Sequence, residues 1–159
     1  MIEQPVIGST DRRTSMQILL IEDNGGDATL VKLGFKDTAP TATISWQTTA
    51  EAGLRALEKY HDLYDLILLD LNLPKMSGAQ FVAHVATRPE TGKIPIMILS
   101  SSPASQVVGA PHGDRPLGYI TKPSDLAGYR SIAKYLHDCW TADEWTESGE
   151  IKVRFKRFD

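Results

Sequence analysis

Three carboxylates stand directly after two short apolar runs of the sequence. Glu22 and Asp23 follow the run 18–21, and Asp70 follows the run 66–69. If the two runs are neighbouring strands of one sheet, these carboxylates converge and repel one another unless a cation joins them. Mg²⁺ is the natural cation, because this hard ion is usually held by one or two carboxylates, water and phosphate oxygens. The pattern therefore predicts a Mg²⁺ site, with Asp23 and Asp70 as direct ligands.

A carboxylate lifted out of a buried strand can also act as a nucleophile. Attack of Asp70 on a phosphoryl donor gives an aspartyl phosphate, and a metal ion and a cation offset the charge on the transferring oxygens. Ser100 and Lys122 follow two further strand-like runs, and they supply a hydroxyl donor and a mobile ammonium group. We therefore expect Asp70 to be the phosphoacceptor and the other two residues to hold the phosphate.

Five strand-and-helix repeats are expected to position these residues. The expected strands are 18–21, 43–46, 66–70, 96–100 and 117–121. Continuous apolar runs are typical of parallel strands that are covered on both faces. The sequence therefore predicts an α/β fold with a doubly wound five-stranded parallel sheet. Ligands bind such a sheet at the carboxyl ends of its strands, where all the candidate residues fall.

Helix-breaking residues and helix-capping patterns refine the prediction of the helices. The segment 103–118 contains three prolines and three glycines, too many breakers for a regular helix, so the fourth helix is expected to be irregular or missing. Capping-box patterns precede two other helices. The paired residues are Thr48 with Glu51, and Ser77 with Gln80.

The length of 159 residues fits one domain with tails. Residues 1–15 show no clean period and are expected to be a flexible lead-in, residues 16–140 to form the domain, and residues 141–159 to be a C-terminal extension. Within that extension, apolar residues alternate with basic ones from 151 to 156, which is the period of a strand. The extension is therefore expected either to add a strand or to pack across a homodimer.

Composition excludes several classes of protein. The chain is 42% hydrophobic and 23% charged with a formal net charge of −3, which does not favour a nucleic-acid partner. The single cysteine, Cys139, rules out an internal disulfide framework, and the first residues lack the layout of a signal peptide. No apolar run reaches membrane-spanning length. We expect a cytoplasmic protein with no membrane contact.

The pattern resembles the receiver domain of two-component response regulators, the CheY-like family. The segments 20–24 and 68–74 carry the resemblance, together with Ser100 and the pair Lys122-Pro123. It extends over residues 17–140 and is greatest for the small stand-alone regulators paired with bacterial phytochromes. The resemblance implies a flavodoxin-like sheet of order 2-1-3-4-5. It also implies that a sensor histidine kinase, such as a bacterial phytochrome, phosphorylates Asp70, and that the protein signals by phosphorylation-dependent protein contacts.

The resemblance also assigns roles to single residues. The implied metal ligands are Glu22, Asp23, Asp70 and Asn72. Among these, Asn72 would give a backbone carbonyl and Glu22 would act mainly through water. Tyr119 matches the aromatic switch position of the family, and the peptide bond before Pro123 is expected to be cis. Apart from taking up and losing its own phosphoryl group, the chain is not expected to be an enzyme.

Two other classes of protein compete with this interpretation. A phosphatase of the haloacid dehalogenase kind also places a nucleophilic aspartate and Mg²⁺ at a strand end, but it usually has a second aspartate two residues later. Asn72 occupies that position here, which removes the general acid and favours a phosphate store. A degenerate receiver, which binds partners without phosphorylation, is favoured only by the irregular segment 103–118. The intact acid pair with Ser100 and Lys122 speaks against it.

Overall fold

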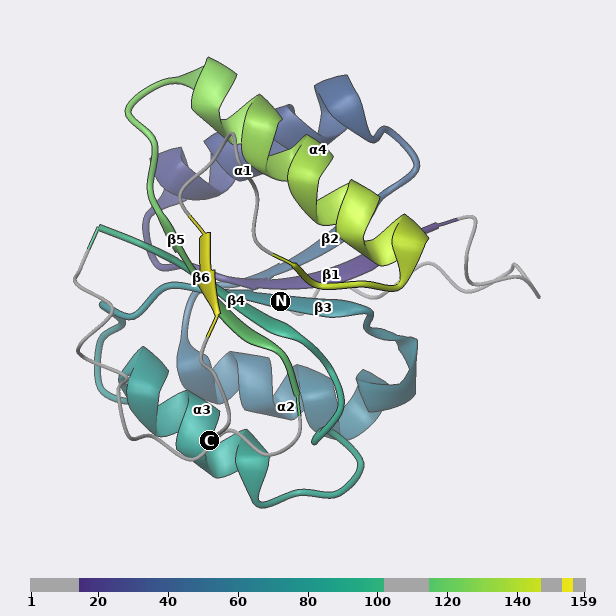
Figure 1. Ribbon diagram of the computed structural model, residues 1–159. Coiled ribbons are helices and arrows are strands. Elements are labelled where there is room, and N and C mark those ends of the chain that lie inside the picture. The colour runs from purple at the N-terminus through teal and green to yellow at the C-terminus, as the bar shows by residue number, and fades with distance from the viewer. Residues whose placement is uncertain (1–14, 102–114, 147–152, 156–159) are drawn as a thin grey trace.

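The computed structural model describes residues 15–101, 115–146 and 153–155 of the chain (Figure 1). The strands are β1 (Gln17–Ile21), β2 (Thr43–Gln47), β3 (Leu66–Leu69), β4 (Ile96–Ser100), β5 (Leu117–Thr121) and β6 (Val153–Phe155). The helices are α1 (Gly25–Thr38), α2 (Ala50–Tyr60), α3 (Gly78–Ala86) and α4 (Leu126–Ala142), with a short 3-10 helix, η2 (His61–Leu63).

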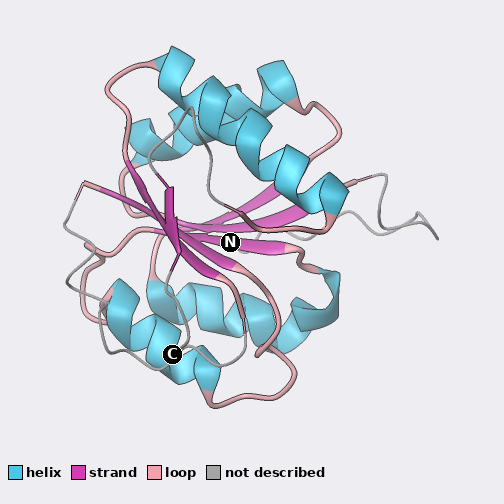
Figure 2. Cartoon of the chain, viewed as in Figure 1, coloured by secondary structure: helices cyan, strands magenta, loops and turns pink. Residues whose placement is uncertain are grey.

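One twisted sheet forms the centre of the fold. Its first five strands are parallel in the order β2-β1-β3-β4-β5, which confirms the predicted α/β fold and strand order. The sixth strand, β6, pairs antiparallel with β5, and Tyr119 lies opposite Arg154. Helices α1 and α4 cover one face of the sheet, and α2 and α3 cover the other (Figure 2).

The core consists of two apolar layers separated by the sheet. Along β1, Leu19 and Ile21 belong to the layer under α2 and α3, whereas Ile18 and Leu20 belong to the layer under α1 and α4. Side chains alternate between the two faces of a strand, and both faces here are covered, so every residue of β1 is buried. This burial explains why the strands read as continuous apolar runs.

Both predicted capping patterns lie at the start of a helix, but only one has the expected partners. At α3, the hydroxyl of Ser77 accepts from the backbone N–H of Gln80, and the Gln80 side chain accepts from the backbone N–H of Ser77, as predicted. At α2, the cap is Thr49, which accepts from the N–H of Ala52. The predicted cap at Thr48 is wrong by one residue, because β2 continues to Gln47 and the helix begins correspondingly later.

The described residues contain four α-helices, which agrees with an irregular or missing helix after β4. Most of the segment behind that prediction, 102–114, lies outside the described residues, as does the predicted lead-in up to residue 14. Within the described part of the chain, no helix is long and apolar enough to cross a membrane.

Candidate metal and phosphoacceptor site

The three predicted carboxylates meet at the carboxyl edge of the sheet. Glu22 and Asp23 follow β1 and Asp70 follows β3, and these two strands are neighbours. One carboxylate oxygen from each residue lies within 4.8 Å of the others. Glu22 and Asp70 are buried and Asp23 is exposed. Three oxygen donors with one open side suit a hard divalent cation that keeps part of its water shell.

Lys122 brings a positive charge into this group of acids. Its Nζ lies 2.6 Å from Oε1 of Glu22, 2.8 Å from Oδ2 of Asp27 and 3.1 Å from Oδ2 of Asp70. The Ser100 hydroxyl donates to the other oxygen of Asp70, Oδ1, over 3.0 Å. The ends of β4 and β5 hold the two donors together, since the backbone N–H of Lys122 donates to the carbonyl of Ser100. Both oxygens of Asp70 therefore accept a hydrogen bond from a group suited to hold a phosphate.

The surroundings of the two buried acids shift their pKa values in opposite directions. Burial raises the pKa of Glu22 to about 8, and the neighbouring Asp70 adds to this effect against the opposing influence of Lys122. Burial also acts on Asp70, but hydrogen bonds from Glu22 and from the N–H of Asn72, together with Lys122, lower the pKa of Asp70. The pKa of Lys122 is raised despite its burial, because Asp27 and Glu22 accept from it. The lowered pKa favours an ionised Asp70, which is the form that the predicted nucleophile needs.

The structure adds two residues that sequence reasoning missed. Asp27 contacts Lys122, and the indole N–H of Trp46 donates to the backbone carbonyl of Glu22 over 2.7 Å. Trp46 is the last residue of the strand predicted at 43–46 and the penultimate residue of β2, so a search for functional groups near strand ends could also have indicated it. Asp27 lies in the first turn of α1, and Asp23 precedes that helix. The contact of Asp27 with Lys122 joins elements that are distant in the sequence, so no local pattern indicated Asp27.

The remaining predicted site residues lie around this centre. Asn72 is exposed, and its backbone N–H donates to Oδ1 of Asp70 over 3.2 Å. Tyr119 is half-buried on β5 against the layer of α2 and α3, and this burial raises the pKa of its phenol. The structure thus places Asn72 beside Asp70, and Tyr119 on β5 three residues before Lys122.

The predicted cis peptide bond before Pro123 is wrong, because all described peptide bonds are trans. The trans form is the intrinsically favoured one, by about 0.5–1 kcal/mol for a bond preceding proline. Lys122 reaches Glu22, Asp27 and Asp70 from this backbone, so the contacts of the site do not require the cis form.

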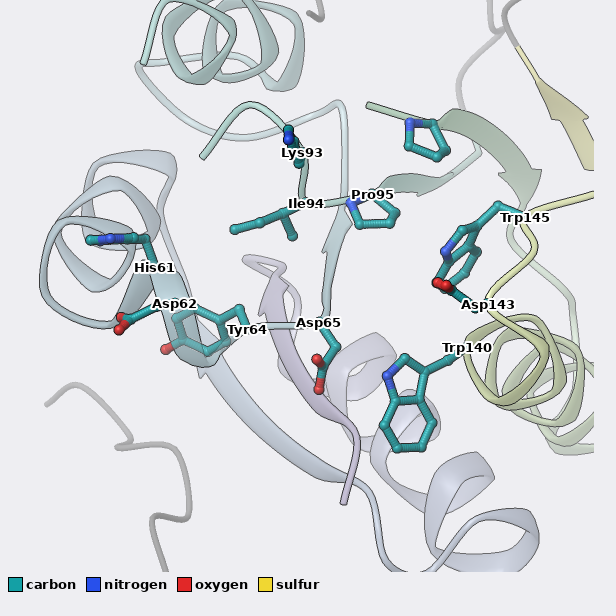
Figure 3. A pocket seen from close by; sticks show the side chains of 11 residues that line it. His61, Asp62, Tyr64, Asp65, Lys93, Ile94, Pro95, Trp140, Asp143 and Trp145 are labelled. Atoms are coloured by element: carbon teal, nitrogen blue, oxygen red, sulfur yellow. The ribbon is translucent and has the colours of Figure 1, made fainter. Parts of the chain in front are cut away.

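A hollow of about 750 Å³ lies at the amino ends of the strands, at the opposite end of the sheet from the carboxylates (Figure 3). Its lining includes Tyr64 and Pro95, which precede strands, and Trp140 and Trp145 from the end of α4 and beyond it. None of the carboxylates described above lines it. The cluster of carboxylates at the carboxyl ends of the strands therefore lies outside this hollow.

Comparison with known proteins shows the same architecture. The family model described as "Response regulator receiver domain" matches residues 18–134, which include all the candidate site residues. The response regulator Rcp1 of Synechocystis sp. is 30% identical over 132 residues, covering 77% of this chain and 87% of Rcp1.

Two solved structures share this fold. The phosphorylated cyanobacterial phytochrome response regulator RcpA has a TM-score of 0.69 with 26% identity. The Mn²⁺-bound form of Rcp1 has a TM-score of 0.66, also with 26% identity. In both cases the similarity covers 84% of this chain and 99% of the other.

Proposed function

Because the chain belongs to the response regulator receiver family, we propose that it accepts a phosphoryl group from a sensor histidine kinase on Asp70. It then signals through protein contacts that depend on this phosphorylation. The main support for the proposal is the set of groups that surround Asp70. One of its carboxylate oxygens accepts from Ser100 and the other from Lys122, beside two further acids.

Phosphoryl transfer requires an ionised Asp70. One of its carboxylate oxygens attacks the phosphorus of the donor, and the bond from phosphorus to the leaving nitrogen of a phosphohistidine breaks as the new P–O bond forms. Ser100 and Lys122 donate to the oxygens of the transferred group, where charge accumulates. Water later attacks the same phosphorus, which releases inorganic phosphate and restores the carboxylate. Uptake of a phosphoryl group on its own aspartate and hydrolysis of that group are the only reactions that we assign to the protein.

Mg²⁺ is the cation proposed for the carboxylate cluster. Glu22, Asp23 and Asp70 offer the oxygen donors that Mg²⁺ prefers, and the relative Rcp1 has a Mn²⁺-bound form. When bound, the ion would offset the charge of the acids and of the transferring phosphoryl group. The fourth proposed ligand is the backbone carbonyl of Asn72.

The similarity to RcpA and Rcp1 supports a bacterial phytochrome as the sensor kinase. We place the encounter in the cytoplasm, without nucleic acid or membrane. A homodimer is proposed as one form of output, because β6 extends the sheet beyond β5 and an edge strand can pair with another chain. A mass equal to one chain, measured in solution with the C-terminal extension intact, would contradict the dimer.

The deciding experiment is the intact mass after incubation with acetyl phosphate and Mg²⁺. We expect addition of one phosphoryl group to the wild type. The adduct should be absent from Asp70→Asn and from samples without Mg²⁺. If the wild type stays unmodified under conditions that label a control receiver, the function is instead that of a receiver that binds partners without phosphorylation.

A further inference from the structure

Asp27 is an acid beside the site that the metal cluster does not use. Among the described residues, the carboxylates close enough together to share a cation are those of Glu22, Asp23 and Asp70. Asp27 lies in the first turn of α1, where its backbone N–H donates to the side chain of Asn24 over 2.9 Å. Its carboxylate is therefore carried by a capped helix, and it contacts Lys122 over 2.8 Å.

All three N–H donors of the Lys122 ammonium group can be assigned to carboxylates. The partners are Glu22, Asp27 and Asp70, at 2.6, 2.8 and 3.1 Å. A cation at the metal cluster would compete with Lys122 for oxygens of Glu22 and Asp70, since both residues belong to that cluster. Competition for these oxygens leaves the contact with Asp27 in place.

Exposure places Asp27 on the solvent side of this arrangement. The side chain of Asp27 is 32% exposed, whereas those of Glu22 and Asp70 are 4% and 6% exposed. The contact also joins two elements that are distant in the sequence, because Lys122 follows β5 and lies 95 residues after Asp27. Asp27 is thus the most exposed of the three acids that hold the ammonium group.

We propose that Asp27 is a positioning residue that keeps the Lys122 ammonium group beside Asp70 while a cation and a phosphoryl group occupy the oxygens of the buried acids. This inference rests on the proposed function. Lys122 has two further donors, which turn to the phosphoryl oxygens as they leave Glu22 and Asp70. If Asp27 instead held Lys122 away from the phosphoryl group, removal of Asp27 would speed up phosphorylation.

The kinetic test compares the rate of phosphoryl uptake from acetyl phosphate with Mg²⁺ in a double-mutant cycle. Asp27→Ala should slow uptake about three- to tenfold in the wild-type background and leave it nearly unchanged in Lys122→Ala. Asp27→Asn keeps an oxygen acceptor without the charge, so it should slow uptake less than Asp27→Ala. An equal effect of Asp27→Ala in both backgrounds, equal losses in the Asn and Ala variants, or faster uptake would overturn the positioning role.

A second measurement follows Lys122 without any phosphorylation. The rate at which acetic anhydride acylates Lys122, read from peptide masses in the presence of Mg²⁺, should rise at least about threefold in Asp27→Ala, because the remaining ion pair is lost. Arg130→Ala is the matched control, since it removes a different ion pair, with Asp37. Equal acylation of the wild type and Asp27→Ala would overturn the inference. Failure of the wild type to take up phosphate, with acylation as expected, would overturn only the proposed function.

Discussion

Asn72 stands two residues after Asp70, exposed to solvent and hydrogen-bonded to it through the backbone. A carboxylate at this position would be able to take a proton from an attacking water. General-base catalysis typically accelerates a reaction about 10²–10⁴-fold, so we expect Asn72→Asp to shorten the lifetime of the aspartyl phosphate by about 100-fold, the lower end of that range. Uptake should change less, because the attacking oxygen belongs to Asp70.

The measurement is the decay of the phosphorylated mass after removal of acetyl phosphate. Asn72→Ala is the control for loss of the amide side chain alone. Ser102, which lies outside the described residues, is expected to affect decay more than uptake as well. Unchanged decay in variants of both positions would show that neither residue controls the access of water.

Trp46 holds in place the backbone of the turn that carries Glu22 and Asp23. Its indole N–H donates to the carbonyl of Glu22, and its ring lies under the ammonium group of Lys32, 4.7 Å from the ring centroid. Trp46→Phe keeps an aromatic ring but removes the N–H donor. We expect a loss of about 1 kcal/mol in the free energy of unfolding.

The same variant should bind Mg²⁺ about threefold more weakly, because the turn that carries Glu22 and Asp23 is less restrained. Calorimetric titration with Mg²⁺ gives the dissociation constant. Lys32→Ala removes the contact of the ring with the ammonium group and keeps the N–H, so it should leave the affinity unchanged. An unaltered affinity in Trp46→Phe would limit the role of Trp46 to packing.

At the level of elements, α1 and α4 approach each other closely at Gly34. A Cβ atom there would lie 2.7 Å from the backbone carbonyl oxygen of Tyr129 in α4. Because backbone cannot rotate aside as a flexible side chain can, we expect Gly34→Ala to lower the free energy of unfolding by about 1–3 kcal/mol. Gly25, in the same helix, has its nearest such contact at 3.9 Å, so Gly25→Ala should lie within about 0.5 kcal/mol of the wild type.

Urea unfolding of the two variants beside the wild type checks this expectation. A destabilisation of similar size in both would mean that the glycines matter for chain flexibility rather than for helix packing. Equal stability of Gly34→Ala and the wild type would mean that α1 and α4 can move apart at no cost.

The sequence predicted the elements better than it predicted their contacts. Runs of buried apolar residues marked the strands because both faces of the sheet are covered, and the polar residues at their ends met at one edge because this depends only on strand order. The pairing of Lys122 with Asp27 depends on how α1 packs beside the end of β5, which no local pattern contains. The same limit applies to the helix cap at Thr49, where the length of β2 moved the boundary by one residue.

At the scale of the whole molecule, the acid cluster opposes folding until its charges are offset. Glu22 and Asp70 are buried side by side at the centre of the sheet edge, and one lysine neutralises part of their charge. A cation that binds only the folded state stabilises it by mass action, by about 2.7 kcal/mol when its concentration is 100 times its dissociation constant. For a chain of this length, we expect Tm to rise by about 5–10 °C at that concentration of Mg²⁺.

Thermal unfolding in Mg²⁺, and in NaCl of the same ionic strength, separates binding from general screening. The shift should shrink strongly in Asp70→Asn and in Asp23→Asn, because each removes one of the clustered carboxylates. Asp37→Asn, a change of the same charge on the far part of α1, should keep the full shift. If NaCl raised Tm as much as Mg²⁺ does, the cluster would be only a region of high negative charge, and the proposed phosphoryl transfer to Asp70 would lack its proposed cation.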